Sequence, residues 1–327
     1  MATVQLAIRD ASRVTVFSLQ ASPRDAHSWL QLAKRCEESG FDALLAADHP
    51  GSSASPFVAL AAAAAVTSTL GLGSYVSNTG VREPVLLAAD VATLDVVSDG
   101  RARLGLGAGH TPAEWGAVGR VRPDVAGRVR RCIAVAEAVR ALLAGEDIDV
   151  NTTDLVAQAA RLSAPRPVQD HVPLTLGGAN SRLLRWAGTH ADTVGLSGFG
   201  RTLGDGHSHE VRWREHELEA QLQQVADGAA GRENPPLLEA LVQQVTVTDD
   251  AYAAVADHAH EIGCQADHAH EIGLTEDELL GAPFMLVGTE DEIIAAIAER
   301  ERRWGITRYV VREDALDVAA ALMRRLA

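Results

Sequence analysis

Short apolar runs and longer helical stretches alternate eight times along this chain of 327 residues, and that alternation restricts its fold more than any other feature. Each apolar run is aliphatic or β-branched and ends near Gly, Asp, Ser or Asn, which is typical of a strand that leads into a loop. The expected strands cover residues 14–19, 43–47, 70–78, 103–106, 174–176, 193–196, 241–247 and 308–311. No linker-like change of composition interrupts the series.

Signals for helix ends fall between these runs. A helix expected over 25–39 ends at Gly40, Pro84 begins a helix that continues to about residue 98, and a long helix from 123 to 144 is closed by Gly145. Eight consecutive βα units favour a parallel (β/α)8 TIM barrel over a doubly wound sheet. We therefore expect one barrel domain over residues 1–327, with insertions in the loops after the strands.

The formal net charge is −15, from 44 acidic and 29 basic residues, and Lys34 is the single lysine. Nucleic acids and anionic membranes need a basic face, so the charge argues against both as partners. Any anion must be held by arginines or backbone amides. The three cysteines are widely spaced, so neither a disulfide framework nor a Cys-x-x-Cys metal site is predicted, and we expect a cytoplasmic protein. We expect no signal peptide, and the longest apolar stretch, 57–66, is too short for a membrane span.

In a (β/α)8 barrel the chemistry lies in the loops after the strands. The second expected strand is followed directly by Asp48 and His49. A histidine beside a carboxylate at a strand end can move a proton near neutral pH, while the acid fixes its tautomer or holds a ligand. The alternative interpretation is that His49 is a turn or helix-start residue.

Two further strand ends are rich in glycine. Residues 104–110 carry glycine at every second position, which lets the backbone approach a flat ring or a phosphate, although tight barrel packing explains the same pattern. Residues 177–181 read Gly-Gly-Ala-Asn-Ser ahead of a helix, whose first-turn amides could bind a phosphate. Asn180 and Ser181 are also good helix caps, so capping is the alternative.

Residues 256–263 are repeated letter for letter in 266–273. On a helix His258 and His260 would point about 200° apart, so they could not share one metal ion. We interpret the repeat as a solvated duplication rather than a metal site, and predict no bound metal.

Taken together, these segments resemble the luciferase-like monooxygenase superfamily, and within it the actinobacterial oxidoreductases that use the deazaflavin coenzyme F420. The matching stretches occur in family order: 37–42 leading to Asp48-His49, 84–109, 165–169 leading to Gly177-Gly178, 286–290 and 303–306. They cover nearly the whole chain. The resemblance implies the same barrel, with a flavin or deazaflavin across its C-terminal mouth.

The resemblance also implies roles for residues at that mouth. Asp48 would contact the cofactor ring, and His49 would donate or accept the proton. The third strand would press a cis peptide bond or a bulge against the ring, with Tyr75-Val76 as the expected bond. The other implied cofactor contacts are Ser77, Asn78, Gly107, Ala108 and Gly109, with Gly177, Gly178 and Ala179 around the phosphate. We add His110 and Asn180 as cofactor-binding candidates, and Arg182, in the first turn of the helix after these glycines, as the counter-charge for the phosphate.

The sequence departs from the family pattern at two points. Some deazaflavin enzymes of the family carry a glutamate just after the fourth-strand glycines, where this chain has His110, and they carry lysines around the phosphate. Glu114 is near enough along the chain to supply a carboxylate instead. The duplicated segment falls where the family would have a single copy.

The implied function is hydride transfer between reduced coenzyme F420 and a small organic substrate, with reduction of a C=C or C=N bond as the expected direction. The first alternative is an FMN-dependent monooxygenase that works with a separate reductase. The second is a barrel that has lost catalysis and acts as a binding protein. We expect a homodimer, and a substrate pocket walled by residues 50–56, 111–121 and 198–208.

Overall fold

The structure is a computed structural model that describes residues 14–202, 209–256 and 273–326. By their internal contacts these residues divide into two compact units, Leu19–Gly177 and a second unit that includes Gly178–Ala327 together with the chain up to Ser18. Strand β1 (Val16–Gln20) spans the division. The expectation of a single domain stays a prediction, and each unit is described by itself below.

Four parallel strands form the sheet of the first unit: β2 (Ala43–Ala46), β3 (Gly71–Ser74), β5 (Ala102–Gly107) and β8 (Leu174–Gly177). Strand β3 pairs with β2 and β5, and β5 pairs with β8, all in parallel register. The short strand β4 (Ser77–Asn78) extends the pairing along β5. The leucines of these strands are buried, as expected for strands covered on both faces.

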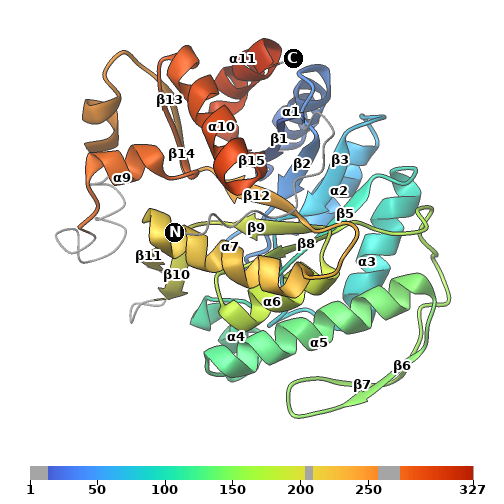
Figure 1. Ribbon diagram of the computed structural model, residues 1–327. Helices are drawn as coiled ribbons and strands as arrows, with labels where there is room; N and C mark the ends of the chain where they lie inside the picture. The colour runs from blue at the N-terminus through green and yellow to red at the C-terminus, as the bar shows by residue number, and fades with distance from the viewer. Residues whose placement is uncertain (1–13, 203–208, 257–272, 327) are drawn as a thin grey trace. The chain divides into compact units, whose positions relative to one another are not determined.

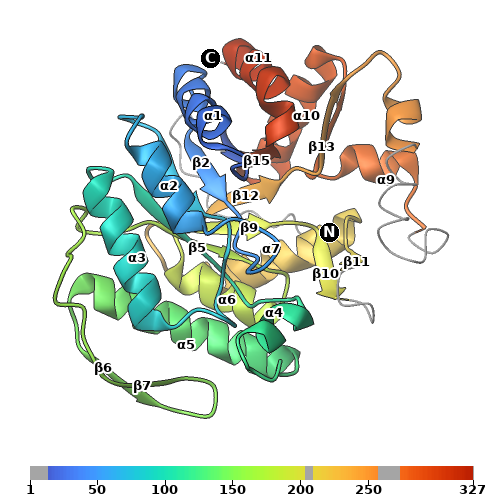
Figure 2. The same cartoon turned by 180° about the vertical axis from the view of Figure 1, so that it is seen from behind.

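Helices follow the strands of this unit in order: α1 (Ala26–Glu38), α2 (Pro56–Ala64), α3 (Pro84–Val97), α4 (Pro112–Ala117) and α5 (Val125–Ala144). Helices α2, α3 and α5 pack in succession around the strands (Figures 1 and 2). Asp25 caps α1 by accepting the Ser28 N–H, and Gly145 ends α5 with φ of 91°. Beyond α5 an antiparallel hairpin, β6 (Ile148–Asn151) and β7 (Val156–Ala160), occupies part of the segment predicted to be irregular.

The second unit carries three parallel barrel strands: β9 (Thr193–Leu196), β12 (Leu237–Leu241) and β15 (Ile306–Arg312). Strand β12 lies between the other two. The helices are α6 (Ser181–His190), α7 (Glu215–Ala229), α9 (Glu276–Gly281), α10 (Glu290–Trp304) and α11 (Leu316–Leu326), with a 3-10 turn at Glu313–Ala315. Strands β10 (Phe199–Thr202) and β11 (His209–Val211) form a hairpin, and β13 (Gln244–Val247) pairs with β14 (Met285–Gly288).

The eight strands β1, β2, β3, β5, β8, β9, β12 and β15 alternate with helices, so the fold is the predicted (β/α)8 barrel. One predicted strand was wrong: residues 241–247 were expected to form the seventh barrel strand. That strand is β12, which ends at Leu241, and the β-branched residues after it form β13 in a separate sheet. The β-branched run has a higher intrinsic strand propensity than β12, because Glu239 and Ala240 in β12 are poor strand formers.

One other boundary differs from the prediction: the expected strand over 70–78 is interrupted between Ser74 and Ser77. The alanine-rich helix α2 before it ends at Ala64. Glu37 fixes the backbone between the end of α2 and the start of β3. One of its carboxylate oxygens accepts the backbone N–H groups of Ser68, Thr69 and Leu70.

Among the described helices, none is both long enough and apolar enough to cross a membrane.

Candidate active site

The candidate site lies within the first unit, where the chain leaves β2. Asp48 and His49 follow that strand, and the turn after them is closed by the N–H groups of Ser52 and Ser53, which donate to the His49 carbonyl. The His49 N–H in turn donates to Ser53 Oγ at 2.9 Å. The turn interpretation of His49 therefore holds for its backbone, while its side chain remains 40 % exposed.

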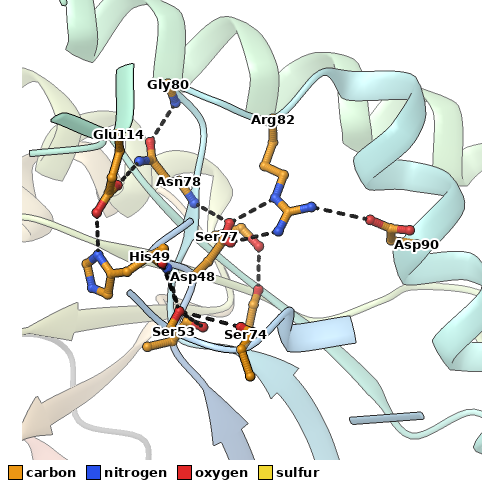
Figure 3. A network of polar contacts seen from close by, with 12 residues as sticks. Asp48, His49, Ser53, Ser74, Ser77, Asn78, Gly80, Arg82, Asp90 and Glu114 are labelled. Carbon is orange, nitrogen blue, oxygen red and sulfur yellow. Dashed lines mark hydrogen bonds and ion pairs between the residues drawn. The ribbon is translucent and has the colours of Figure 1, made fainter. Parts of the chain in front are cut away.

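The imidazole of His49 is held by Glu114 of helix α4. The distance from His49 Nδ1 to Glu114 Oε1 is 2.8 Å, and Figure 3 shows the contact. The Glu114 side chain is only 6 % exposed. Burial alone would raise the pKa of Glu114, but hydrogen bonds from His49, Asn78 and Thr111 and the charge of His49 outweigh burial, so the pKa lies below its usual value. Glu114 is therefore an ionised hydrogen-bond acceptor at neutral pH.

This carboxylate fixes the tautomer of His49. An ionised carboxylate can only accept, so His49 Nδ1 must carry the hydrogen that lies between the two groups. Nε2 is then the ring nitrogen that takes up a proton or gives one away. A partly exposed histidine that is bonded to a carboxylate through one ring nitrogen is an arrangement suited to general acid–base chemistry.

Asn78 holds Glu114 from the other side. Its Nδ2 donates to Glu114 Oε2 at 2.5 Å, and its Oδ1 accepts the Gly80 N–H at 2.8 Å. Because a backbone N–H can only donate, the Gly80 contact fixes which end of the Asn78 amide faces Glu114. Both oxygens of Glu114 are thus engaged, one by His49 and one by Asn78.

Asp48 anchors the end of β2 to β4. Its oxygens accept from Arg82 Nη2 at 2.7 Å and Arg82 Nε at 3.0 Å, and from the backbone N–H of Asn78 at 3.0 Å. Asp48 is 2 % exposed. Its hydrogen bonds and charge raise the pKa of Arg82 above its usual value, although burial works the other way. Figure 3 shows Arg82 between Asp48 and Asp90, whose carboxylate lies 3.8 Å from Arg82 Nη1.

The Tyr75-Val76 peptide bond is cis, as the resemblance implied. The Tyr75 carbonyl accepts from Gln20 Nε2 at 2.5 Å, and Ser77 Oγ donates to Ser74 Oγ at 2.8 Å. The side chain of Val76 lies against three backbone positions, Gly105, Gly107 and Gly177, where an added Cβ would meet it. At Gly105 the added Cβ would collide with the Ser74 carbonyl oxygen, and at Gly107 it would lie 2.5 Å from Val76 Cγ2, whereas at Gly177 its nearest contact is 3.2 Å away. The packing interpretation of the fourth-strand glycines is therefore confirmed at Gly105 and Gly107.

The half-exposed segment after β5 brings a second imidazole to the site. Gly109 has φ of 69°, and an added Cβ there would collide with the Asn78 amide. The next residue, His110, places its ring edge-on to His49, with ring centroids 5.5 Å apart. Trp115 Nε1 donates to the Gly109 carbonyl at 3.3 Å. The structure thus brings His49, His110 and Glu114 together from two different loops.

The expected phosphate residues divide between the two units. Gly177 ends β8 in the same unit as His49, whereas Gly178, Ala179, Asn180 and Arg182 belong to the second unit. Asn180 caps α6 by accepting the N–H groups of Arg182 and Leu183, so the capping interpretation is confirmed. The Arg182 side chain is exposed. A role of these residues in phosphate binding stays a prediction.

Arg82 is the site residue that sequence reasoning missed. It follows the third strand in an unpatterned segment just before the proline that begins α3, and only the fold brings it to Asp48. The sequence suggested Glu114 as a carboxylate of the site but did not indicate that it binds His49. Within residues 14–202, 209–256 and 273–326 no group of three or more His, Cys, Asp or Glu side chains could hold a metal ion, and His258 and His260 lie outside those ranges.

Comparison with known proteins agrees with this fold. Residues 10–308 match the family described as luciferase-like monooxygenase. The match covers most of the chain, and the protein belongs to this family.

Three relatives illustrate the range of similarity. An uncharacterised protein of Mycobacterium tuberculosis is 35 % identical over 153 residues, which are 46 % of this chain and 52 % of that protein, so the chain spans about half of its length. An F420-dependent glucose-6-phosphate dehydrogenase of Beutenbergia cavernae is 29 % identical over 307 residues, 90 % of this chain and 82 % of that one. The solved coenzyme F420-dependent tetrahydromethanopterin reductase of Methanopyrus kandleri has a TM-score of 0.70 at 22 % identity, over 94 % and 96 % of the two chains, and shows the same fold.

Proposed function

We propose that this protein is an oxidoreductase that transfers a hydride between reduced coenzyme F420 and a small organic substrate, with His49 as the proton donor or acceptor. The single observation that carries the proposal is His49 at a barrel strand end, partly exposed and bound through Nδ1 to the ionised Glu114 at 2.8 Å. The F420-dependent relative that matches 90 % of the chain supports the choice of cofactor.

The residues around His49 fit a flat aromatic cofactor. Ala108 and Gly109 have small side chains or none, His110 adds an imidazole, and the ends of β5 and β8 are glycines that let Val76 lie close to the backbone. Asp48 is neutralised by Arg82, so it leaves no unpaired buried charge beneath the site. We propose that Tyr75, Val76, Ser77, Asn78 and the segment 107–110 border the ring, and that Gly177–Asn180 and Arg182 serve the phosphate.

Each group then has a defined task. The bound coenzyme supplies or takes up the hydride. Reduction of a C=C or C=N bond leaves negative charge on one atom of the substrate, and His49 Nε2 donates the proton that neutralises it. In the oxidative direction the same nitrogen accepts the proton. Glu114 holds the ring in orientation and stabilises the imidazolium form by its charge.

A binding and turnover comparison tests the proposal. Purified protein is titrated with coenzyme F420 and, separately, with FMN, and fluorescence reports binding. Reduced coenzyme F420 is then offered with cyclic enones and imines, and its oxidation is followed by absorbance. The His49→Gln variant should bind the coenzyme as the parent does and lose about 100-fold or more in turnover, the usual range for removing a general acid. Absence of saturable binding, or unchanged turnover of the variant, would contradict the proposal.

The family description supports a second candidate, an FMN-dependent monooxygenase that receives reduced flavin from a separate reductase. Oxygen uptake that depends on reduced FMN, together with tighter binding of FMN than of coenzyme F420, would favour it. We further propose that the protein is cytoplasmic and forms a homodimer. Sedimentation velocity measures the oligomeric state directly.

A further inference from the structure

Arg122 and Arg128, at the start of helix α5, have no carboxylate partner in the described part of the chain, unlike Arg120 and Arg130 near them in the sequence. Arg128 is 9 % exposed, and its one hydrogen bond is a long one, 3.4 Å from Nη1 to the Pro123 carbonyl. Arg122 precedes the helix, and its Nε is buried without a hydrogen-bond acceptor in the described part of the chain. Neither guanidinium has a carboxylate within ion-pair distance among the described residues.

The arginines on either side are fully engaged. Arg120 forms an ion pair with Glu83 and donates to the Gly80 carbonyl, and Arg130 binds Asp154 with Nε 2.7 Å from Oδ2. Arg131 donates to the carbonyls of Thr79 and Asp154. In a chain with 44 acidic and 29 basic residues, carboxylates are plentiful. Arg122 and Arg128, which have no carboxylate partner among the described residues, therefore depart from the pattern of the arginines around them.

The two positive charges of Arg122 and Arg128 are unfavourable without a bound anion. Burial lowers the pKa of both arginines, and the charge of Arg122 lowers the pKa of Arg128 further. Asp124 offsets part of the charge at Arg128, but its Oδ1 is used in accepting the Gly127 N–H as the cap of α5. Two like charges that are partly desolvated are unfavourable unless an anion lies between them.

The pair lies a short distance along the chain from the proposed proton-transfer group. Glu114 and Trp115 are in α4, the Arg120 N–H donates to the Trp115 carbonyl, and Arg120 Nη1 reaches the Gly80 carbonyl at 2.6 Å. The segment from α4 to α5 is thereby fixed against the residues that follow β4. Arg122 comes two residues after this fixed point.

We infer that Arg122 and Arg128 form a binding site for an oxyanion, either a phosphate or a carboxylate group, carried by a small-molecule ligand. A guanidinium offers a planar fork of donors that matches both groups, and two such forks can share one oxyanion. The site itself does not depend on the proposed function, but its assignment to the coenzyme or to the substrate does.

Inorganic phosphate is the first probe. Thermal unfolding of the full-length protein is followed as phosphate is added at constant ionic strength, with chloride as the reference anion. We expect a saturable rise of Tm with phosphate. The Arg122→Gln/Arg128→Gln variant should bind phosphate about 100-fold more weakly or worse, because two charge-assisted contacts are lost. Arg140→Gln, on the same helix and with the same change of charge, should respond as the parent does.

The unfolding temperature without phosphate separates a binding site from a structural role. If the two arginines only stabilise the fold, the double variant should melt at a lower temperature than the parent. If they form an unoccupied anion site, removal of their mutual repulsion should leave Tm unchanged or raise it. An equal phosphate response of parent and double variant, or a large fall of Tm in the double variant without phosphate, would overturn the inference.

A second titration identifies the source of the anion. Coenzyme F420 and its chromophore without phosphate and acidic side chain are each titrated into the parent and the double variant by fluorescence. If the double variant binds the full coenzyme more weakly than the parent does, but binds the chromophore equally well, the site belongs to the coenzyme. If the double variant binds both ligands as the parent does but has lost the response to phosphate, the site belongs to the substrate. If the parent binds no deazaflavin, the proposed function fails while the phosphate response still decides the inference.

Discussion

Replacement of Glu114 by Gln should reverse the tautomer of His49, and the reason lies in the hydrogen bonds around Asn78. The Gly80 N–H fixes Asn78 Oδ1, so Asn78 must present its Nδ2 to residue 114. A glutamine there has one oxygen, which must accept from Asn78, and its amide NH2 then faces His49 Nδ1. That nitrogen would have to accept, which moves the ring hydrogen to Nε2.

The magnitude follows from the contact that is lost. The bond between His49 and Glu114 is 2.8 Å long, with the Glu114 side chain 6 % exposed. A charge-assisted hydrogen bond of this kind contributes about 1.5–3 kcal/mol, which corresponds to roughly 10–150-fold in rate if it acts on the protonated form of His49 in the transition state. Binding of the coenzyme should change little, because Glu114 is buried behind the imidazole.

Nitrogen-15 NMR of the histidine side chains measures the tautomer directly, and His49→Gln identifies the signal. Steady-state turnover with reduced coenzyme F420 measures the rate. Glu239→Gln is a matched control, because Glu239 is also a buried carboxylate near an arginine, 3.6 Å from Arg308 Nε, but lies in the other unit. An unchanged His49 tautomer in Glu114→Gln, or an equal loss of turnover in the control, would refute the reasoning.

Three further predictions concern the framework of the site. Arg82→Met leaves Asp48 buried without its ion-pair partner and should lower the free energy of unfolding, measured by urea denaturation, by about 3–5 kcal/mol. The double variant Arg82→Met/Asp48→Asn should recover part of that stability, and equal stability of the single and double variants would contradict the pairing. Gly107→Ala should lower stability by about 1–3 kcal/mol in the same assay, because the new methyl group meets Val76, and Gly116→Ala, where nothing lies within 4 Å, is its control. Burial raises the pKa of Glu37, but the N–H groups of residues 68–70 and the Thr69 hydroxyl lower it to about 2 from 4.5. The ionised Glu37 therefore contributes its full share to the free energy of unfolding above pH 4.5, and this share is lost as the pH falls toward 2. Glu37→Gln should therefore cost about 1–2 kcal/mol at pH 7, a value reduced for solvent exposure, and the difference from the parent should shrink by more than half at pH 3; a difference independent of pH would exclude this role.

Much of the barrel could be predicted because its signals are local. Strand ends at glycine and helix starts at proline follow from backbone sterics at single residues, and the capping of α6 by Asn180 needs only four consecutive positions. The same locality explains the error at the seventh strand. Glu239 and Ala240 have low strand propensity, and only pairing with β9 and β15 makes Leu237–Leu241 a strand.

The sequence by itself determined that Asp48 and His49 follow a barrel strand and that glycines end the fourth and fifth barrel strands. The tertiary structure alone decided their partners. Glu114 is 65 residues from His49 and Arg82 is 34 residues from Asp48, on segments with no periodic pattern that connects them. A hydrogen bond between side chains depends on where two loops meet in space, and this meeting is set by the packing of the strands and helices that carry the loops.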